Sequence, residues 1–456
     1  MNLRRWLTPE LGIKRWLLVI FAGLLVLAMG VAHVIRQMTR DVQPTGFTQV
    51  LIDFVTLQFL PYPLRGLLAG LVGVTLVVIG AVRLIRVLMD PFRPVDGDQP
   101  LVELIYQKRF LARGPRVVAI GGGTGLSTLL RGLKEVTSNV TAVVTVADDG
   151  GSSGILRAEL GIPPVGDIRN CIAALADAEP LMSRLLQYRF PDPDDPLPIE
   201  AELDPETHGV RPEKGGLTGH AVGNLLIAAL TAIEEGDFEE GVRQMNRVLA
   251  VRGQVLPVSP IPLTLHARLA DGSEVVGQSR IARAEGIQRV WIEPRDVEAS
   301  EDALDAIADA ELIVLGPGSL YTSLLPSLLV PDVRDAVLTS PAVRIYVCNV
   351  ATQLGETQGY DLAAHVDALT AHTAPGIVDA VLGNNDFHAR EPSAWRAEAV
   401  RLTWPPSGTD VPRLVLDDIV DPDNAHHHDP ARLAVSLLRL LEAERGRRRA
   451  GVARSA

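Results

Sequence analysis

One segment constrains the fold of this chain more than any other: an apolar run, a glycine turn and a helical pattern in direct succession. Residues 116–133 read RVVAIGGGTGLSTLLRGL, so β-branched residues lead into glycines, and apolar residues then recur at helical spacing. A buried strand that turns directly into a helix is the repeating unit of α/β domains. The segment therefore predicts an α/β fold.

The same alternation continues along the chain. Further buried strands are expected at Val140–Val146, Arg289–Ile292, Leu312–Leu315 and Val343–Val350, with helical patterns between them. A hairpin is expected from Thr264–Leu269 to Glu274–Gly277, and helices at Leu217–Ile233 and, as a solvated charged helix, at Arg432–Arg448. Together these patterns predict a doubly wound, mostly parallel sheet of the Rossmann-like class.

Composition and charge exclude some partners. The 456 residues are 47% hydrophobic and 21% charged, which is typical of a globular protein. Residues 1–116 hold 14 Lys and Arg against 7 Asp and Glu, whereas residues 117–456 hold 29 against 48. The acidic larger part argues against nucleic acid as a partner, because nucleic-acid-binding domains carry a basic face. The two cysteines, Cys171 and Cys348, are expected to be small core residues.

Two apolar stretches predict membrane spans. Trp16–Ile35 is 20 residues long with one ionisable group, His33, and Leu64–Leu88 is a second candidate. About 20 apolar residues cross a bilayer as a helix. A signal peptide is the alternative for the first stretch, but the run is longer than usual and no A-x-A site follows. We therefore expect a membrane anchor over 1–89, a linker over 90–115 and the α/β domain over 116–456.

The distribution of basic residues predicts the orientation of that anchor. Lys and Arg are more frequent before the first span and after the second than between them, so both ends should face the cytoplasm. The expected location is the cell membrane, multi-pass, with the lipid bilayer as a partner. Residues 190–207, rich in Pro, Asp and Glu, are expected to be a surface insertion. Whether residues 47–60 lie in the membrane interface or cover the spans stays open.

The glycine turn at 121–125 is a candidate phosphate site. Glycines let backbone N–H groups approach an anion at the start of the next helix. The spacing does not match the dinucleotide pattern, because Leu126 stands where a glycine is needed, and no Walker A lysine follows. The turn is therefore a phosphate cradle of another kind or, alternatively, a tight turn without a ligand.

Two adjacent carboxylates follow the second strand. Asp148 and Asp149 stand where open α/β sheets bind ligands, and one of them could bind Mg²⁺ or a sugar hydroxyl while the other holds the loop. Asp148 and Asp149 are therefore the candidate metal ligands, and Mg²⁺ is the candidate ion. No cofactor is expected to be required. An Asx-turn with a helix cap is the alternative.

Further loops carry similar chemistry. His220 and Asn224 share one helix face at i and i+4, and a structural histidine is the alternative reading. Tyr321 could stack on a base or a sugar. His426–His428 is expected to be a solvated loop rather than a metal site. The full set of candidate ligand-binding residues is Gly121, Gly122, Gly123, Thr124, Gly125, Asp148, Asp149, Gly151, Ser152, Ser153, Asp167, Asn170, His220, Asn224, Gly316, Gly318, Ser319, Tyr321, Thr322, Ser323, Asn349 and Thr352.

Six segments in order resemble one family. GGGTGLSTLLRGLK, VTVADDGGSSGILR, PPVGDIRN, GLTGHAVGNLL, GPGSLYTSLLPSLLV and CNVATQLGETQGY resemble the YvcK family of gluconeogenesis factors, in a superfamily with the 2-phospho-L-lactate transferase CofD. The resemblance covers residues 116 to the C-terminus. It implies binding of UDP-N-acetylglucosamine or a related UDP-sugar, a role in cell shape and wall homeostasis, and a homodimer. The predicted membrane spans, the 190–207 insertion and His427, where the family pattern has Arg, depart from it.

Two functions follow from these observations. The first is a non-catalytic UDP-sugar sensor, favoured because no nucleophile–base pair is evident in the sequence. The alternative is a CofD-like transferase that moves a phospholactyl group from a nucleotide diphosphate donor to a deazaflavin, with Mg²⁺. A NAD-dependent oxidoreductase is disfavoured by the glycine spacing.

Overall fold

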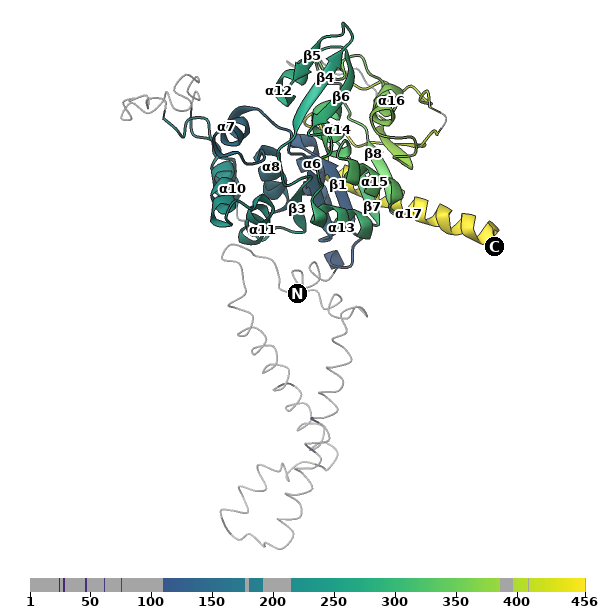
Figure 1. The fold of residues 1–456 in the computed structure, drawn as a ribbon. Helices are drawn as coiled ribbons and strands as arrows, with labels where there is room; N and C mark the ends of the chain where they lie inside the picture. Colours follow the sequence, from purple (N-terminus) through teal and green to yellow (C-terminus); the bar gives the residue numbers. More distant parts are fainter. Residues whose placement is uncertain are drawn as a thin grey trace. The chain divides into compact units, whose positions relative to one another are not determined.

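The computed structural model divides the chain into two units, Met1–Arg109 and Phe110–Ala456. The described residues are 110–176, 180–191, 215–385, 397–408 and 410–455, with residues 24, 28, 46, 61 and 75 of the first unit. Apart from residues 24, 28 and 75, the predicted spans at 16–35 and 64–88 lie outside the described residues, and so does most of the 190–207 insertion. Among the described helices, none combines the length and apolarity that a bilayer crossing requires. Figure 1 labels the elements of the second unit.

A seven-stranded sheet forms the centre of the second unit. Its order is β10-β9-β8-β7-β1-β2-β3, and every neighbouring pair is parallel. The strands are β1 (Val117–Gly121), β2 (Val140–Val144), β3 (Gln254–Pro257), β7 (Leu312–Leu315), β8 (Val343–Val347), β9 (Ala380–Asn384) and β10 (Arg413–Asp417). All five residues of β1 are buried, as expected for a strand covered on both faces. The predicted doubly wound parallel sheet is confirmed.

The strand order creates a switch point at β1. The chain runs outward from β1 through β2 to β3 and then returns to the other side of β1 as β7. Val117 of β1 therefore pairs with Val140 on one side and Leu312 on the other. At such a point the connections from neighbouring strands leave in opposite directions and open a crevice beyond the carboxyl ends of the strands.

A small antiparallel sheet stands apart from the main one. Its order is β5-β4-β6, with β4 (Thr264–Leu269), β5 (Glu274–Val276) and β6 (Ile287–Glu293). The predicted hairpin is confirmed, but β6, expected as a strand of the parallel sheet, pairs antiparallel with β4 instead. Its burial alternates along the strand, as in a strand with one solvated face, unlike the continuous burial of β1.

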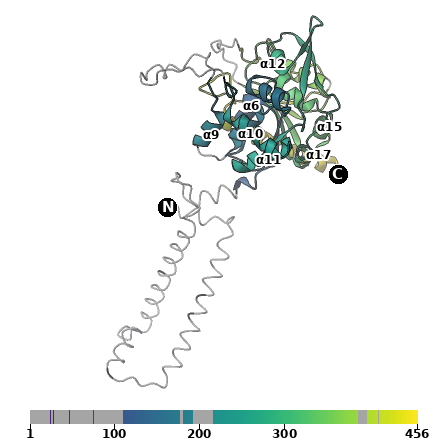
Figure 2. The ribbon, with the colours of Figure 1, turned by 60° about the vertical axis from the view of Figure 1, so that its left-hand side comes forward.

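Helices connect the strands. They are α6 (Gly123–Leu133), α7 (Gly151–Leu160), α8 (Gly166–Leu175), α9 (Pro180–Gln187), α10 (Val222–Ile233), α11 (Phe238–Val248), α12 (Gln278–Ile281), α13 (Glu301–Asp309), α14 (Leu325–Leu328), α15 (Pro331–Thr339), α16 (Leu362–His372) and α17 (Pro430–Ser455), with a π-helical turn η4 (Leu320–Leu324). Figure 2 shows α9, α10 and α11 side by side, as their contacts require.

The last helix corrects one expectation. The segment Arg432–Arg448 was predicted to be solvated, but Leu433, Leu437 and Leu441 of α17 are buried. These residues lie four apart on one helix face, and α17 contacts α6 through it. The approach is close: a Cβ on Gly132 of α6 would meet the carbonyl of Pro430. The charged residues that suggested a solvated helix occupy the other faces.

A candidate ligand cleft at the carboxyl edge of the sheet

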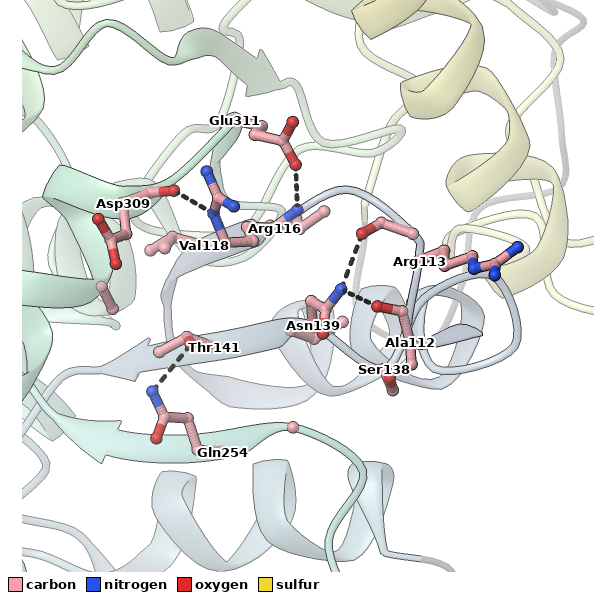
Figure 3. A pocket seen from close by; sticks show the side chains of 15 residues that line it. Ala112, Arg113, Arg116, Val118, Ser138, Asn139, Thr141, Gln254, Asp309 and Glu311 are labelled. Carbon is pink, nitrogen blue, oxygen red and sulfur yellow. Dashed lines mark hydrogen bonds between the residues drawn. The ribbon is translucent and has the colours of Figure 1, made fainter. Parts of the chain in front are cut away.

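Two hollows lie at opposite ends of the central strands. The first, of about 800 Å³, lies at the amino-terminal ends of β1 and β2. Figure 3 shows that its polar groups bond to one another: the Arg116 backbone N–H donates to Glu311 at 2.8 Å, and the Asn139 amide donates to the carbonyl of Gly114 at 2.8 Å. Open α/β sheets bind their ligands at the carboxyl ends of the strands, so this hollow at the amino-terminal ends is not the candidate ligand site.

The second hollow is a cleft of about 670 Å³ at the carboxyl ends of the strands. Its walls include Gly122–Gly125 after β1, Gly318–Ser319 with Thr322 and Ser323 after β7, and Asn349–Gln353 after β8. These three strands are neighbours around the switch point. Turns that are far apart in the sequence therefore meet in one cleft, where open α/β sheets bind their ligands.

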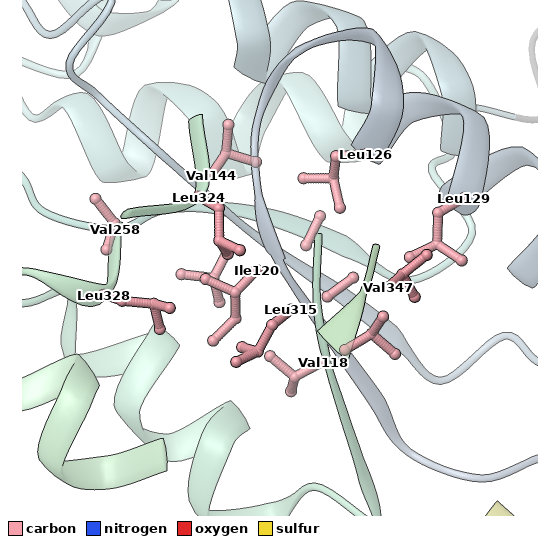
Figure 4. Packing of buried hydrophobic residues seen from close by; sticks show 14 of the residues in the cluster. Val118, Ile120, Leu126, Leu129, Val144, Val258, Leu315, Leu324, Leu328 and Val347 are labelled. Atoms are coloured by element: carbon pink, nitrogen blue, oxygen red, sulfur yellow. The ribbon is translucent and has the colours of Figure 1, made fainter. Parts of the chain in front are cut away.

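Apolar packing fixes the strands beneath this cleft. Figure 4 shows Ile120 of β1 and Leu315 of β7 packed together with Leu126 and Leu129 of α6 and with Leu328 of α14. All five side chains are fully buried. Cys171 and Cys348 are also buried and unbridged, as predicted. The strand ends that carry the turns are thus held by a close-packed core, which resists displacement.

Glycine at two positions allows the turns to approach. A Cβ on Gly125 would lie 2.7 Å from the carbonyl oxygen of Pro317, which belongs to the β7–η4 turn. A Cβ on Gly122 would lie 2.4 Å from Oδ2 of Asp167. Both distances are shorter than any carbon–oxygen van der Waals contact, so a side chain at either position would push the walls apart.

Asn349 holds the β7–η4 turn in place. Its amide Nδ2 donates to the carbonyl of Gly318 at 2.9 Å, and the Gly318 N–H donates to its Oδ1 at 3.1 Å. The neighbouring Gln353 donates to the hydroxyl of Ser319 at 2.7 Å. Asn349 was predicted as a ligand contact; the structure uses its amide to shape the turn that borders the cleft.

Glu356 is a cleft residue that the sequence prediction omitted from the site. Its Oε1 accepts a hydrogen bond from the Thr322 hydroxyl at 2.5 Å, and its Oε2 accepts one from the Tyr321 N–H at 3.2 Å. Burial raises the pKa of Glu356 to about 7, and these hydrogen bonds oppose the rise. The π-helical turn of residues 320–324 is thus tied to a carboxyl group in the cleft wall, and such turns are frequent at functional sites.

Two carboxylates share the wall beside the β1–α6 turn, but they are not the pair predicted. Asp148 and Asp167 both line the cleft. Burial raises the pKa of Asp148, and burial together with the Asp148 charge raises the pKa of Asp167 to about 7. Asp149 does not line the cleft, because its Oδ1 accepts the Ser279 N–H at 2.8 Å.

Within the described residues no group of three His, Cys, Asp or Glu is arranged for a metal ion. The Mg²⁺ site stays a prediction.

A smaller hollow of about 290 Å³ adjoins the cleft and shares Asp148 and Asp167 with it. Beside it, the Ser152 hydroxyl lies 3.0 Å from Nδ1 of His220 and accepts a hydrogen bond from the Asn224 amide at 3.0 Å. The sequence showed no hydroxyl–imidazole pair, whereas the fold forms one from residues 68 positions apart. The predicted helix at Leu217–Ile233 begins only at Val222, so His220 precedes α10 and does not share a helix face with Asn224; the two side chains meet through Ser152 instead.

The histidine run also differs from its expectation. His426, His427 and His428 all line the cleft, and His428 is buried rather than solvated. Its Nε2 lies 3.2 Å from the carbonyl oxygen of Cys348, the residue before Asn349. Burial lowers the pKa of His428 to about 4, so it is neutral at pH 7 and donates to that carbonyl. A neutral imidazole thereby anchors the C-terminal loop to the end of β8.

Most of the predicted residues line one of the two adjoining hollows. Those that do are Gly122, Gly123, Thr124, Gly125, Asp148, Gly151, Ser152, Ser153, Asp167, Asn170, Asn224, Gly318, Ser319, Thr322, Ser323, Asn349 and Thr352. Gly121, Asp149, His220, Gly316 and Tyr321 line neither. Lining residues that the prediction missed include Thr128, Gln278, Arg283, Gln353, Glu356 and the three histidines.

The structure places Tyr321 away from the cleft. Its ring is buried, its hydroxyl lies 2.8 Å from that of Tyr360, and its ring makes an edge contact with His372. It does not line the cleft, and its stacking on a base or a sugar stays a prediction. Only its backbone N–H serves the site, through Glu356.

The fold and the cleft together define the class of this protein: it is a Rossmann-like α/β protein whose cleft opens at the switch point. The family model for the 2-phospho-L-lactate transferase CofD matches residues 117–402. The gluconeogenesis factor of Bacillus subtilis is 47% identical over 277 residues, which cover 60% of this chain and 80% of that protein. The chain belongs to the YvcK/CofD family of gluconeogenesis factors.

Relatives of other lengths match as well. A Nostoc protein is 45% identical over 392 residues, 86% of this chain and 80% of its own. A Deinococcus radiodurans protein is 38% identical over 444 residues, 96% of this chain and 89% of its own, so that match extends into residues 1–109. The crystal structure of a Bacillus halodurans protein of the UPF0052 family superposes with a TM-score of 0.63 at 42% identity, covering 72% of this chain and 99% of that one.

Proposed function

We propose that this protein binds a UDP-sugar, UDP-N-acetylglucosamine, in the cleft and acts as a non-catalytic regulator of cell-wall and central-carbon homeostasis and of cell shape. One observation supports this most: turns with glycines and hydroxyls, from β1 and β7, border one cleft at the switch point. Backbone N–H groups at helix starts bind phosphate oxygens. The cleft volume of about 670 Å³ lies within the roughly 300–1,000 Å³ usual for ligand sites.

The cleft walls are pre-formed in a way that suits binding. The N-cap of α6 is Gly122, which has no capping side chain. The Gly123 N–H bonds to the Asp167 carboxyl, and the N–H groups that follow it have no partner within the helix. Asn349 and Glu356 hold the opposite turn by hydrogen bonds on both of their polar atoms. A site whose walls are already ordered loses little conformational entropy when it binds its ligand.

Calorimetry of the full-length chain with UDP-N-acetylglucosamine, with and without Mg²⁺, tests this function. Binding of one nucleotide per chain without release of UDP is expected. Asn349→Leu frees the β7–η4 turn and should weaken binding at least tenfold. Gln254→Leu changes a similar amide in the amino-edge hollow and should leave binding unchanged. No heat of binding, or equal affinity in both variants, would reject the proposal.

The transferase alternative is favoured by a separate observation. Asp148 and Asp167, two carboxyl groups at one wall, offer the oxygen ligands that Mg²⁺ prefers. Bound there, Mg²⁺ would neutralise charge on a nucleotide diphosphate. The two carboxylates would hold the ion, and the glycine turns would orient the donor. Transfer to a deazaflavin acceptor, followed by mass spectrometry, distinguishes this activity from binding alone.

Membrane attachment is a further proposal, based on the apolar stretches at 16–35 and 64–88. Expressed in bacteria, the full-length chain should sediment with membranes and stay there through an alkaline carbonate wash, which strips peripheral proteins. Recovery in the wash supernatant would contradict the two predicted spans.

A further inference from the structure

The hollow of about 290 Å³ beside the cleft carries two arginines that the proposed function does not use. We call it the arginine hollow; it is lined by Arg169, Arg189, Asn170 and Asn224 and by the first residues of α7 and α8, among others. Asp148 and Asp167 separate it from the cleft, because both residues line both hollows.

Three helices begin at the arginine hollow without a side-chain cap. Gly151, the first residue of α7, and Gly166, the first of α8, both line it, and Asn224 stands in the first turn of α10. These helices have 10, 10 and 12 residues. The first N–H groups of a helix have no partner within it, and the helix dipole makes them positive. The starts of α7 and α8 thus favour an anion, whereas at the start of α10 the Val222 N–H already donates to the carbonyl of Tyr188 at 2.9 Å.

Buried polar atoms in the hollow lack partners. The Arg169 side chain is only 7% exposed, and its Nε has no hydrogen-bond partner within the described part of the chain. The same is true of Oδ1 of Asn224, a residue that is 1% exposed. An unpaired buried polar atom costs roughly 1–3 kcal/mol. The N–H at Nε of Arg169 could donate to an acceptor such as an anion, and Oδ1 of Asn224 could accept from a donor such as a hydroxyl.

The two guanidinium groups are bonded to neutral acceptors. Nη2 of Arg169 donates to Oδ1 of Asn170 at 2.9 Å, and Arg189 donates to the carbonyl of Gly219. Burial lowers the pKa of Arg169, and repulsion from Arg189 lowers it further. An anion between the arginines would relieve this repulsion.

We propose that the arginine hollow is a second ligand site, for a small phosphorylated or carboxylated compound that also carries a hydroxyl group. The anionic group lies against Arg169, Arg189 and the starts of α7 and α8, and the hydroxyl donates to Asn224. A volume of about 290 Å³ is below the usual range for ligand sites, which disfavours a sugar nucleotide and suits a smaller metabolite. This site does not depend on what fills the cleft.

The test is calorimetry on the full-length chain with two probes, inorganic phosphate and malonate, against chloride at equal ionic strength. At least one probe is expected to bind once per chain, both alone and with UDP-N-acetylglucosamine at saturation. If only phosphate binds, the site takes phosphoryl groups; if only malonate binds, it takes carboxylates. Arg189→Met, at an exposed position, should weaken that binding at least tenfold, whereas Arg184→Met, an exposed arginine of α9 outside the hollow, should leave it unchanged.

Arg169 is buried, so Arg169→Lys replaces it with a cation that cannot present the same fork of donors. Affinity for the bound probe should fall while thermal unfolding stays cooperative. The inference is overturned if neither probe binds better than chloride, if Arg189→Met binds as the unchanged protein does, or if the sugar nucleotide displaces the probe competitively. If the sugar nucleotide fails to bind and the arginine-dependent anion binding remains, only the proposed function is rejected.

Discussion

Gly125 is the residue at which the two glycine turns come closest. The Cβ of alanine there would meet main-chain atoms of Pro317 and Gly318, which cannot rotate away as a side chain would. We expect Gly125→Ala to destabilise the fold by about 1–3 kcal/mol, the usual cost of overpacking, and to weaken UDP-sugar binding more than tenfold. Urea unfolding and calorimetry measure the two effects.

A matched control is available in a helix elsewhere. Gly446 of α17 is exposed, and a Cβ there would meet nothing within 4 Å. Gly446→Ala should therefore stabilise the protein by about 0.5–1 kcal/mol through helix propensity alone and leave binding unchanged. If the two alanine variants behaved alike, the close approach of the turns would not be the reason for glycine at 125.

Glu356 makes stability depend on pH in a predictable direction. Its pKa is about 7 in the folded chain, above the ordinary value of 4.5, so between these values the folded state binds the extra proton. Stability then falls as pH rises from 4.5 through 7. Glu356→Gln removes this loss and keeps both hydrogen bonds, with the carbonyl accepting from Tyr321 and the amide donating to Thr322.

Relative to the unchanged protein, Glu356→Gln should therefore gain stability between pH 5 and pH 8, by on the order of 2–3 kcal/mol. Urea unfolding of both proteins at the two pH values measures the difference, in which the contributions of other titrating groups such as Asp167 cancel. A constant difference across this range would show that Glu356 ionises as freely in the fold as in the unfolded chain.

Among the elements, those with a strong local pattern were predictable and those defined by distant contacts were not. β1 and α6 were predicted because a continuous apolar run and a glycine turn precede a helical repeat. β3, β9 and β10 were missed, and length is not the reason, because β9 and β10 have five residues each, as β1 does. They become strands through pairing with β2, β8 and β9, which are distant partners. β6 was assigned to the wrong sheet because its partner is set by the hairpin, which local sequence does not reveal.

The helix α17 offers a direct test of packing at this scale. Leu437 is fully buried, whereas Val435 on the same helix is 40% exposed. Leu437→Ala should cost about 2–5 kcal/mol of unfolding free energy, because it leaves a cavity between α17 and the core. Val435→Ala should change it by no more than about 0.5 kcal/mol. Equal losses would mean that α17 is as solvated as its charges first suggested.

At the scale of the molecule, the sequence predicted that glycine turns from distant segments meet, because parallel strands bring their carboxyl ends to one edge. It did not predict which side chains face the ligand. Asp149 and Tyr321 were chosen for their chemistry, yet one is bonded to Ser279 and the other is buried beside Tyr360. Glu356 lies in the quoted segment CNVATQLGETQGY but was not chosen, Arg189 lies in none of the quoted segments, and only the folded arrangement places both at a hollow.

The most direct test of the central claim is a crystal structure of the full-length chain with UDP-N-acetylglucosamine. The diphosphate is expected between the Gly122–Gly125 turn and the Gly318–Ser319 turn, with backbone N–H groups about 2.7–3.2 Å from its oxygens. A nucleotide seated instead at the amino edge of the sheet, beside Arg116 and Asn139, would contradict the assignment of the cleft.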